Sequence, residues 1–185
     1  QTAKTTVYYT PYVHNLISLW DGANWVPTEF SETTLALGTL TASKPYDVFG
    51  YLSGGVLALE SLAWTSDTAR ATAVTLQDGR YCKSGDKTRL LLGTFYTTSK
   101  TTTEDSAGGS SSNVGAKRYL SNVYNRVPRT VAVYDGTGTW TNPGTTIRQV
   151  RANAGNKIEV VECLGTALIT LSCKGLAAFS GAATF

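Results

Sequence analysis

The sequence is poor in the side chains that carry most enzyme and metal chemistry. Its 185 residues include one histidine, three cysteines and no methionine. The cysteines, Cys82, Cys163 and Cys173, form no C-x-x-C pair, and His14 lies far from all of them in the sequence. Zinc sites need several such ligands at short spacings, so we expect no metal site.

Motifs for nucleophilic catalysis and for phosphate binding are also missing. A nucleophilic serine or cysteine needs a base beside it, and His14 is the single histidine. There is no G-x-S-x-G elbow, no G-x-x-x-x-G-K-[ST] loop and no G-x-G-x-x-G segment opening a helix. We therefore expect no enzyme activity and no cofactor. Four carboxylate pairs could in principle serve as acid and base, namely Glu29 with Glu32, Asp47 with Glu60, Glu104 with Asp105, and Glu159 with Glu162.

The charge balance argues against nucleic acid and membrane partners. Charged residues make up 16% of the chain and the net charge is +3, whereas globular domains have about 25% charged residues. No apolar run approaches the length of about 20 residues that spans a membrane. Basic and aromatic residues do cluster between positions 117 and 151. We expect them to make structural or inter-subunit contacts, and the candidates for inter-subunit contact are Arg118, Tyr124, Arg126 and Arg129.

The residue pattern predicts an all-β protein. Threonine, valine, tyrosine and tryptophan, which favour strands, alternate with turn signals about every ten residues. Short strands with regular turns are typical of an antiparallel β-sandwich or jelly roll, or of a barrel, and we favour a sandwich or jelly-roll-like domain with short hairpins. Helix is scarce. Residues 31–37 could form a short turn, and residues 116–124 suit a helix and a strand equally well.

We expect one domain over residues 1–185. The segment 98–114 is rich in threonine, serine and glycine and is predicted to be a long surface loop that buries almost nothing, with Glu104 and Asp105 solvated. The alternative is two sub-parts, 1–97 and 115–185, joined by that loop. Such a loop could also carry a binding or inter-subunit contact.

Two Asp-Gly turns are flanked by large aromatic residues, which predicts two tight hairpins. Exposed aromatic rings can stack on sugar faces while Asp side chains supply directional hydrogen bonds, so these turns are candidate ligand-binding sites. The alternative is that the rings belong to the core or to an interface. The candidate residues are Trp20, Asp21 and Trp25 in the first turn and Tyr134, Asp135 and Trp140 in the second.

We interpret the cysteines as buried free thiols. The alternative, a bridge between Cys163 and Cys173, leaves Cys82 unpaired. Low cysteine use, together with the lack of a targeting signal, suits a chain made in a reducing cytoplasm.

A series of short motifs carries a resemblance. The motifs are LESLAWTSDTAR (59–70), TLQDG (75–79), RLLLGTF (89–95), TEDS (103–106), KRY (117–119) and YNRVPR (124–129). Together they resemble a group of β-rich proteins of tailed bacteriophages and prophages. The resemblance implies a virion component, such as a segment of a tail fibre or receptor-binding apparatus, and phage fibres are usually trimers.

The expected function is therefore that of a structural virion protein, made in the bacterial host cytoplasm. The resemblance implies a homotrimer that contacts other virion proteins and binds a host cell-surface glycan through several weak sites. Two alternatives remain open: a capsid decoration or head-fibre protein, and a carbohydrate-binding module. None of these three possible functions involves binding of nucleic acid or insertion into a membrane.

Overall fold

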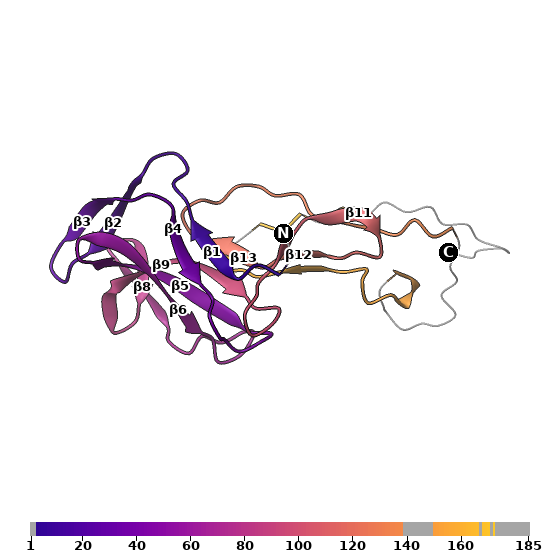
Figure 1. Ribbon diagram of the computed structural model, residues 1–185, viewed down its shortest axis with the longest axis horizontal. Coiled ribbons are helices and arrows are strands. Elements are labelled where there is room, and N and C mark those ends of the chain that lie inside the picture. Colours follow the sequence, from indigo (N-terminus) through magenta and orange to yellow (C-terminus); the bar gives the residue numbers. More distant parts are fainter. Residues whose placement is uncertain (1–2, 139–149, 167, 171, 173–185) are drawn as a thin grey trace, which may run out of the picture.

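The computed structural model describes residues 3–138, 150–166, 168–170 and 172, and it confirms the predicted all-β fold. The strands form a compact head, made of β1 to β9 with β13, and an extended arm, made of β10 to β12 with β14 and β15 (Figure 1). The helical structure in the described residues is a single three-residue 3-10 turn, η1 (Val150–Ala152). No helix among them is long and apolar enough to cross a membrane.

The head is organised around its longest strand, β9 (Asp86–Tyr96). One edge of β9 pairs with β5, and the other edge pairs first with β8 and then with β13. All of these pairs are antiparallel. The outer strands of the central sheet are β6 (Val56–Ala63), which pairs with β5, and β7 (Val74–Gln77), which pairs with β8. The strands that pair with β9 are β5 (Pro45–Ser53), β8 (Arg80–Lys83) and β13 (Leu120–Asn122).

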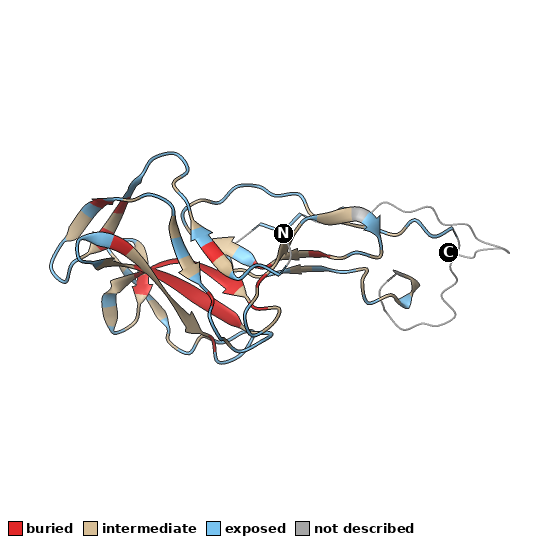
Figure 2. Ribbon diagram, in the orientation of Figure 1, coloured by how far each residue is buried: buried red, intermediate tan, exposed pale blue. Residues whose placement is uncertain are grey.

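Two strand pairs cover one face of the central sheet, which gives the head two layers, consistent with a sandwich. The hairpin β2 (Leu16–Trp20)–β3 (Trp25–Glu29) buries Ile17 and Leu19 against Leu57, Leu90 and Leu92. The pair β1 (Thr6–Tyr9)–β4 (Thr33–Ala36) packs beside it over a second apolar cluster. Period-two alternation places these apolar side chains on one face, and the buried residues concentrate along the central strands (Figure 2).

The opposite face of the central sheet is covered by a segment from the far end of the sequence. Phe49 and Leu91 are fully buried there, and Cys163 packs on them with Val123 and Leu164 beside it. The chain therefore returns from the arm to the head after β15. Cys82 and Cys163 are buried free thiols, as predicted, whereas Cys173 lies outside the described residues.

In the part of the arm that the structure describes there are two small sheets, and each includes a parallel pair. The first has the order β10 (Asp105–Ser106), β12 (Ala116–Arg118), β15 (Ile158–Val160), with β12 and β15 parallel. The second pairs β11 (Gly108–Ser112) with β14 (Ala132–Tyr134), also in parallel. In Figure 1 the β11 strand projects away from the head.

The prediction that residues 98–114 form a long loop that buries almost nothing is wrong. This segment contains β10 and β11, and Thr103 is almost fully buried, as is Thr97 just before it. The two hydroxyl groups hydrogen-bond to main-chain carbonyls: Thr97 Oγ1 donates to Thr41 O at 2.7 Å, and Thr103 Oγ1 donates to Tyr96 O at 2.7 Å. Threonine can be buried here because its hydroxyl is satisfied by the backbone.

Residues 31–37, where a short turn was expected, contain strand β4 at positions 33–36. The segment 116–124, which suited a helix and a strand equally well, contains strands β12 and β13. The Asp21–Gly22 hairpin is confirmed by the β2–β3 pairing. The second Asp-Gly pair, Asp135–Gly136, follows β14, which pairs in parallel with β11, and the expected hairpin partner Trp140 lies outside the described residues.

Gly93 allows β13 to join the head. It pairs with Asn122 of β13, and a Cβ atom at this position would collide with the main-chain carbonyl of Ser121. Glycine is the residue that permits such a close backbone approach. The close pairing fixes the place where the chain leaves β13 and enters the turn at Tyr124.

Candidate functional site

The β2–β3 hairpin lies at the end of the head opposite the arm (Figure 1), and Trp20 and Trp25 flank its Asp21–Gly22 turn. Asp21 closes the turn, since its Oδ1 accepts hydrogen bonds from the main-chain N of Ala23 and of Asn24, both at 2.7 Å. These bonds lower the pKa of the Asp21 carboxyl below its ordinary value. Trp20 and Trp25 face each other across the pair with ring centroids 5.4 Å apart. Asp21 thus shapes the turn, and the tryptophans form its aromatic surface.

Trp25 is held by residues of the neighbouring β7–β8 turn. Its indole Nε1 donates to Asp78 Oδ2 at 2.9 Å, and the Arg80 guanidinium carbon lies 4.6 Å from its ring centroid. A cation over an aromatic face is attracted by the ring quadrupole. Two hairpins far apart in sequence therefore join at Trp25, and Arg80 is fixed beside the ring.

Arg80 also lines a groove of about 400 Å³, a volume in the range of small-ligand sites. The groove lies between the segment before β2, the segment after β13 and the start of β8. Its lining is aromatic, amide and apolar, and it consists of Tyr9, Thr10, Tyr12, Val13, His14, Leu16, Ile17, Ser18, Phe30, Arg80, Leu90, Asn122, Tyr124 and Asn125.

One wall of the groove is the segment between β1 and β2. Tyr9 stacks on Phe30 with ring centroids 5.3 Å apart, and Phe30 N donates to Asn15 O at 2.9 Å. His14 turns back onto the chain, where its Nδ1 accepts a hydrogen bond from Leu16 N at 3.3 Å. Tyr12 is 69% exposed at the rim. The wall thus combines a fixed aromatic pair with an accessible tyrosine.

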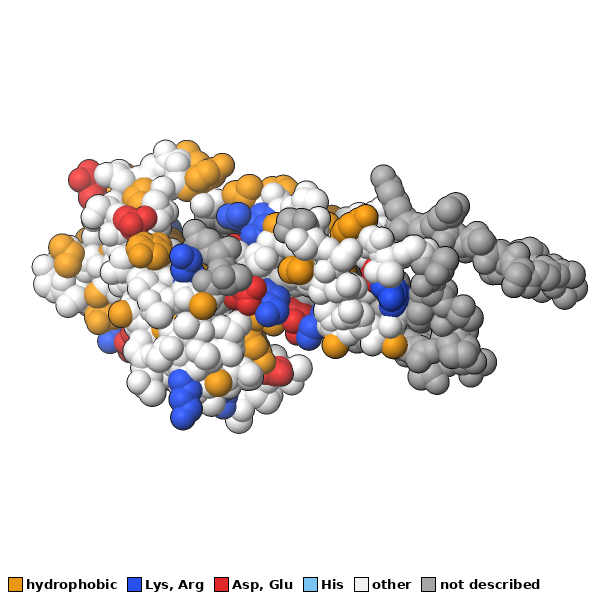
Figure 3. Space-filling model, turned by 45° about the vertical axis from the view of Figure 1, so that its right-hand side comes forward, with side chains coloured by type: hydrophobic (Ala, Val, Ile, Leu, Met, Phe, Trp, Pro, Cys, Tyr) orange, Lys and Arg blue, Asp and Glu red, His pale blue; other side chains and the backbone are white. Residues whose placement is uncertain are grey.

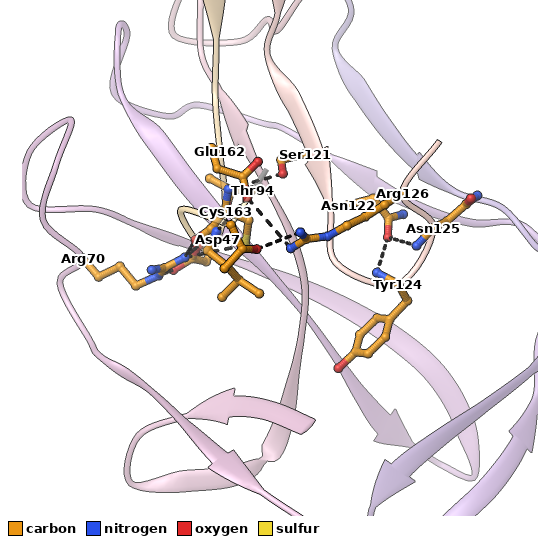
Figure 4. A network of polar contacts seen from close by, with 12 residues as sticks. Asp47, Arg70, Thr94, Ser121, Asn122, Tyr124, Asn125, Arg126, Glu162 and Cys163 are labelled. Atoms are coloured by element: carbon orange, nitrogen blue, oxygen red, sulfur yellow. Dashed lines mark hydrogen bonds and ion pairs between the residues drawn. The ribbon is translucent and has the colours of Figure 1, made fainter. Parts of the chain in front are cut away.

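The opposite wall is Tyr124, and a tight turn fixes its backbone. Asn122 Oδ1 accepts hydrogen bonds from the main-chain N of Tyr124 and of Asn125, both at 2.9 Å. This Asx turn follows directly from the end of β13. Figure 4 shows the Tyr124 ring pointing away from Arg126. Partial burial raises the pKa of the Tyr124 phenol above its ordinary value, so the hydroxyl stays protonated at neutral pH.

A polar network anchors the segments around this turn to the central sheet (Figure 4). The carboxylate of Asp47 on β5 is buried, and it accepts hydrogen bonds from Arg70 Nε and from Thr94 Oγ1, each at 2.7 Å. Arg70 also donates to the main-chain carbonyl of Cys163 and lies over the Trp64 ring. Cys163 N donates in turn to Ser121 Oγ at 3.3 Å. The network therefore ties residue 163 and strand β13 to the sheet.

The sequence-predicted ligand residues fall at two separate places. Trp20, Asp21 and Trp25 lie on the β2–β3 turn of the head, whereas Tyr134 and Asp135 lie on the arm, and Trp140 is outside the described residues. Asp135 is engaged within the arm: its Oδ2 accepts from Asn156 Nδ2 at 2.8 Å and its Oδ1 lies 3.5 Å from Arg151. The structure does not bring the two predicted clusters together.

The four candidates for inter-subunit contact also lie in different surroundings. Arg118 pairs with Asp105 at 2.8 Å, and Arg126 donates to Thr166 Oγ1 at 2.7 Å and lies 3.9 Å from Glu162. Arg129 lines a broader groove between the head, the segment 125–129 and residues 160–162, 166, 168 and 169. Tyr124 lines the aromatic groove. Their inter-subunit role stays a prediction.

Two acidic residues that we expected to be solvated are paired instead. Glu104 contacts Lys117 Nζ at 3.0 Å, and Asp105 contacts Arg118 at 2.8 Å, both between the β10 region and β12. Figure 3 shows acidic and basic side chains close together in the middle of the molecule, where the head meets the arm. The expectation of solvated carboxylates at positions 104 and 105 is therefore wrong.

Sequence analysis did not predict several residues of the groove, above all Tyr12, Arg80, Asn122 and Asn125. They come from three segments separated by more than 40 residues, and no local motif links them. Sequence analysis did single out Tyr124, but as an interface residue. The Asp78–Gly79 turn between β7 and β8 places Asp78 and Arg80 around Trp25.

The candidate pair Asp47 and Glu60 is divided between two ion pairs. Asp47 pairs with Arg70, while Glu60 lies 3.0 Å from Arg89, so each of these two is bound to a cation instead of facing the other. Among the described residues there is also no group of three or more His, Cys, Asp or Glu that could hold a metal ion.

Comparison with protein-family models, curated proteins and solved structures found no match to this chain. The resemblance to phage virion proteins accordingly stays an expectation from the sequence motifs.

Proposed function

We propose that the chain is a non-enzymatic attachment protein of a tailed-bacteriophage particle. Its head binds a host cell-surface glycan in the aromatic groove, and its arm joins further copies of the chain and other virion proteins. The observation that carries this proposal is the groove itself: four aromatic rings, two amide side chains and one arginine converge there from separate segments.

The chemistry of the groove suits a saccharide. Pyranose rings have apolar C–H faces that pack on aromatic rings and hydroxyl groups that need directional hydrogen bonds. Tyr12 and Tyr124 supply rings at the rim, and Asn122 and Asn125 supply amide groups. The phenol hydroxyl of tyrosine can also form hydrogen bonds at the solvent-exposed rim of a site. A groove with this lining recognises sugars by stacking and hydrogen bonding together.

The arm supports the assembly part of the proposal. Within the described residues, β15 stands at the edge of a three-stranded sheet, and its Ile158 and Val160 are 43% and 46% exposed. Small sheets with an uncovered apolar face are only marginally stable alone. Packing of two or more arms against each other would bury this face. A trimer would also turn one weak groove into a high-avidity array on a repetitive surface polymer.

A glycan array of bacterial surface polysaccharides, probed with the fluorescently labelled chain, tests the binding part. We expect discrete glycan hits that disappear in Tyr124→Ala. The matched control is Tyr134→Ala, which removes an exposed tyrosine of the arm and should keep all hits.

Co-purification with phage heads or tails tests the location, and it also separates the alternatives. Recovery with tails together with glycan hits supports the proposal. Recovery with heads and no glycan hits would instead favour a capsid decoration protein. Glycan hits without recovery in either fraction would favour a carbohydrate-binding module.

A further inference from the structure

Arg80 gives the groove a definite charge. It is the first residue of β8, it lines the groove, and its guanidinium lies over the Trp25 ring. Trp25 is itself held by the bond from its Nε1 to Asp78 Oδ2 at 2.9 Å. The contact with this hydrogen-bonded ring therefore places the cation beside the groove.

Within the described residues, Arg80 has no carboxylate at ion-pair distance, and no aspartate or glutamate lines the groove. Five other described arginines each have such a partner, namely Arg70, Arg89, Arg118, Arg126 and Arg151. The lining of the groove thus carries the positive charge of Arg80 and no carboxylate, next to aromatic stacking surfaces, while the Asp78 carboxylate lies outside the lining at the indole Nε1 of Trp25.

We propose that the groove takes an anionic saccharide, whose carboxylate or phosphate group pairs with Arg80 while its ring packs on Tyr12 or Tyr124. This inference rests on the proposed glycan-binding function and specifies its substrate class. A guanidinium binds carboxylate and phosphate oxygens through two parallel N–H donors. The amides of Asn122 and Asn125 lie in the same lining and can serve sugar hydroxyls. A neutral sugar would leave the charge of Arg80 unused.

The test compares chemically matched ligands on the purified full chain by isothermal titration calorimetry. The first pair is a hexuronate oligosaccharide and the same oligosaccharide after its carboxyl groups have been reduced to alcohols. The second pair is a phosphorylated oligomannoside and its phosphatase-treated form, which distinguishes phosphate from carboxylate as the anion. We expect at least tenfold tighter binding of the anionic member in one pair.

Arg80→Gln should remove this preference while leaving the affinity for the neutral member within about twofold. Lys87→Gln is the matched control, because it removes the same charge from an exposed position of β9 outside the groove lining. The control should keep the full preference for the anionic member.

Two results would overturn the inference and separate it from the proposed function. Equal affinity for both members of each pair, unchanged in Arg80→Gln, would remove the anionic class but leave glycan attachment standing. No binding of any glycan, anionic or neutral, would remove both. If Arg80→Gln does not fold, the same titrations of the wild-type chain at different salt concentrations test the inference. The ratio of affinities for the anionic and the neutral ligand must fall as NaCl rises from about 0.05 to 1 M, because salt screens exposed charge pairs. A preference that is independent of salt would contradict the assignment to Arg80.

Discussion

The Arg70 guanidinium pairs with the buried Asp47 carboxylate at 2.7 Å and donates, from the same group, to the main-chain carbonyl of Cys163. One side chain thus joins the central strand β5 to a segment more than 100 residues later. Removing the Asp47 charge leaves Arg70 without its carboxylate in a largely buried place, and loss of one partner from a buried pair costs about 3 kcal/mol.

We therefore predict that Asp47→Asn lowers the free energy of unfolding by about 3 kcal/mol, measured by urea denaturation. Asp67→Asn removes an exposed aspartate from the loop that carries Arg70 and should change the free energy of unfolding by less than about 0.5 kcal/mol. Equal effects of the two variants would show that the Asp47–Arg70 pair does not anchor the C-terminal segment.

Trp25 should be energetically more important than Trp20, although both flank the same turn. Trp25→Phe loses the hydrogen bond from Nε1 to Asp78, and it also weakens the contact with Arg80. Because this hydrogen bond is exposed to solvent, it contributes about 1 kcal/mol, and we expect a loss of that size in thermal unfolding.

Trp20→Phe is the matched control, because it keeps the aromatic pair of the turn and leaves Trp25 bound to Asp78. It should cost less than half as much as Trp25→Phe. A larger loss in Trp20→Phe would contradict the role given to Asp78.

The Asp21 turn predicts a pH dependence. Two main-chain N–H groups donate to its carboxylate and hold its pKa below the ordinary value of 3.8. The folded-state pKa is lowered, so the stabilisation is complete above the unfolded value and is lost as the pH falls through the lower folded value. An NMR titration of the Asp21 side-chain carboxyl carbon should give a midpoint below 3.8. A midpoint at or above 3.8 would show that the turn does not hold the ionised carboxylate.

Self-association should depend on the arm. We expect light scattering across a hundredfold dilution to give a mass near three times 19.7 kDa. The double variant Ile158→Ser, Val160→Ser should dissociate at lower dilution than the wild-type chain, because it removes the exposed apolar side chains of β15. Val56→Ser, at a 61% exposed position of the head, should leave the mass unchanged. A monomer at all concentrations would contradict the trimer.

Local patterns in the sequence predicted much of the fold, and the reason is physical. Period-two alternation and the Asp21–Gly22 turn act over a few residues, and both hold in the β2–β3 hairpin. The threonine-rich segment was misjudged because polar side chains suggest solvent exposure. Thr97 and Thr103 are buried by bonding to distant carbonyls, and composition does not show which carbonyls lie near.

The groove was harder to predict, because it exists only after distant segments meet. Tyr12 and Tyr124 are more than 100 residues apart, and Arg80 lies between them in sequence on a third element. The pairing of β13 with β9 brings Tyr124 to the head, and Gly93 makes that pairing close. Sequence spacing alone does not predict that Tyr12, Arg80 and Tyr124 meet in one groove. The sequence pattern did identify Trp25, which contacts Arg80.

Glycan binding in the aromatic groove is tested by measuring the affinity of the chain for a glycan hit in a groove variant and in an arm variant. The double variant Tyr12→Ala, Tyr124→Ala removes both exposed rings of the groove, whereas Tyr134→Ala removes an exposed ring of the arm. If the glycan binds in the groove, the groove variant loses affinity at least tenfold, equivalent to about 1.4 kcal/mol, and the arm variant keeps its affinity. Unchanged affinity in the groove variant, with loss in Tyr134→Ala, would contradict it and move the binding site to the arm.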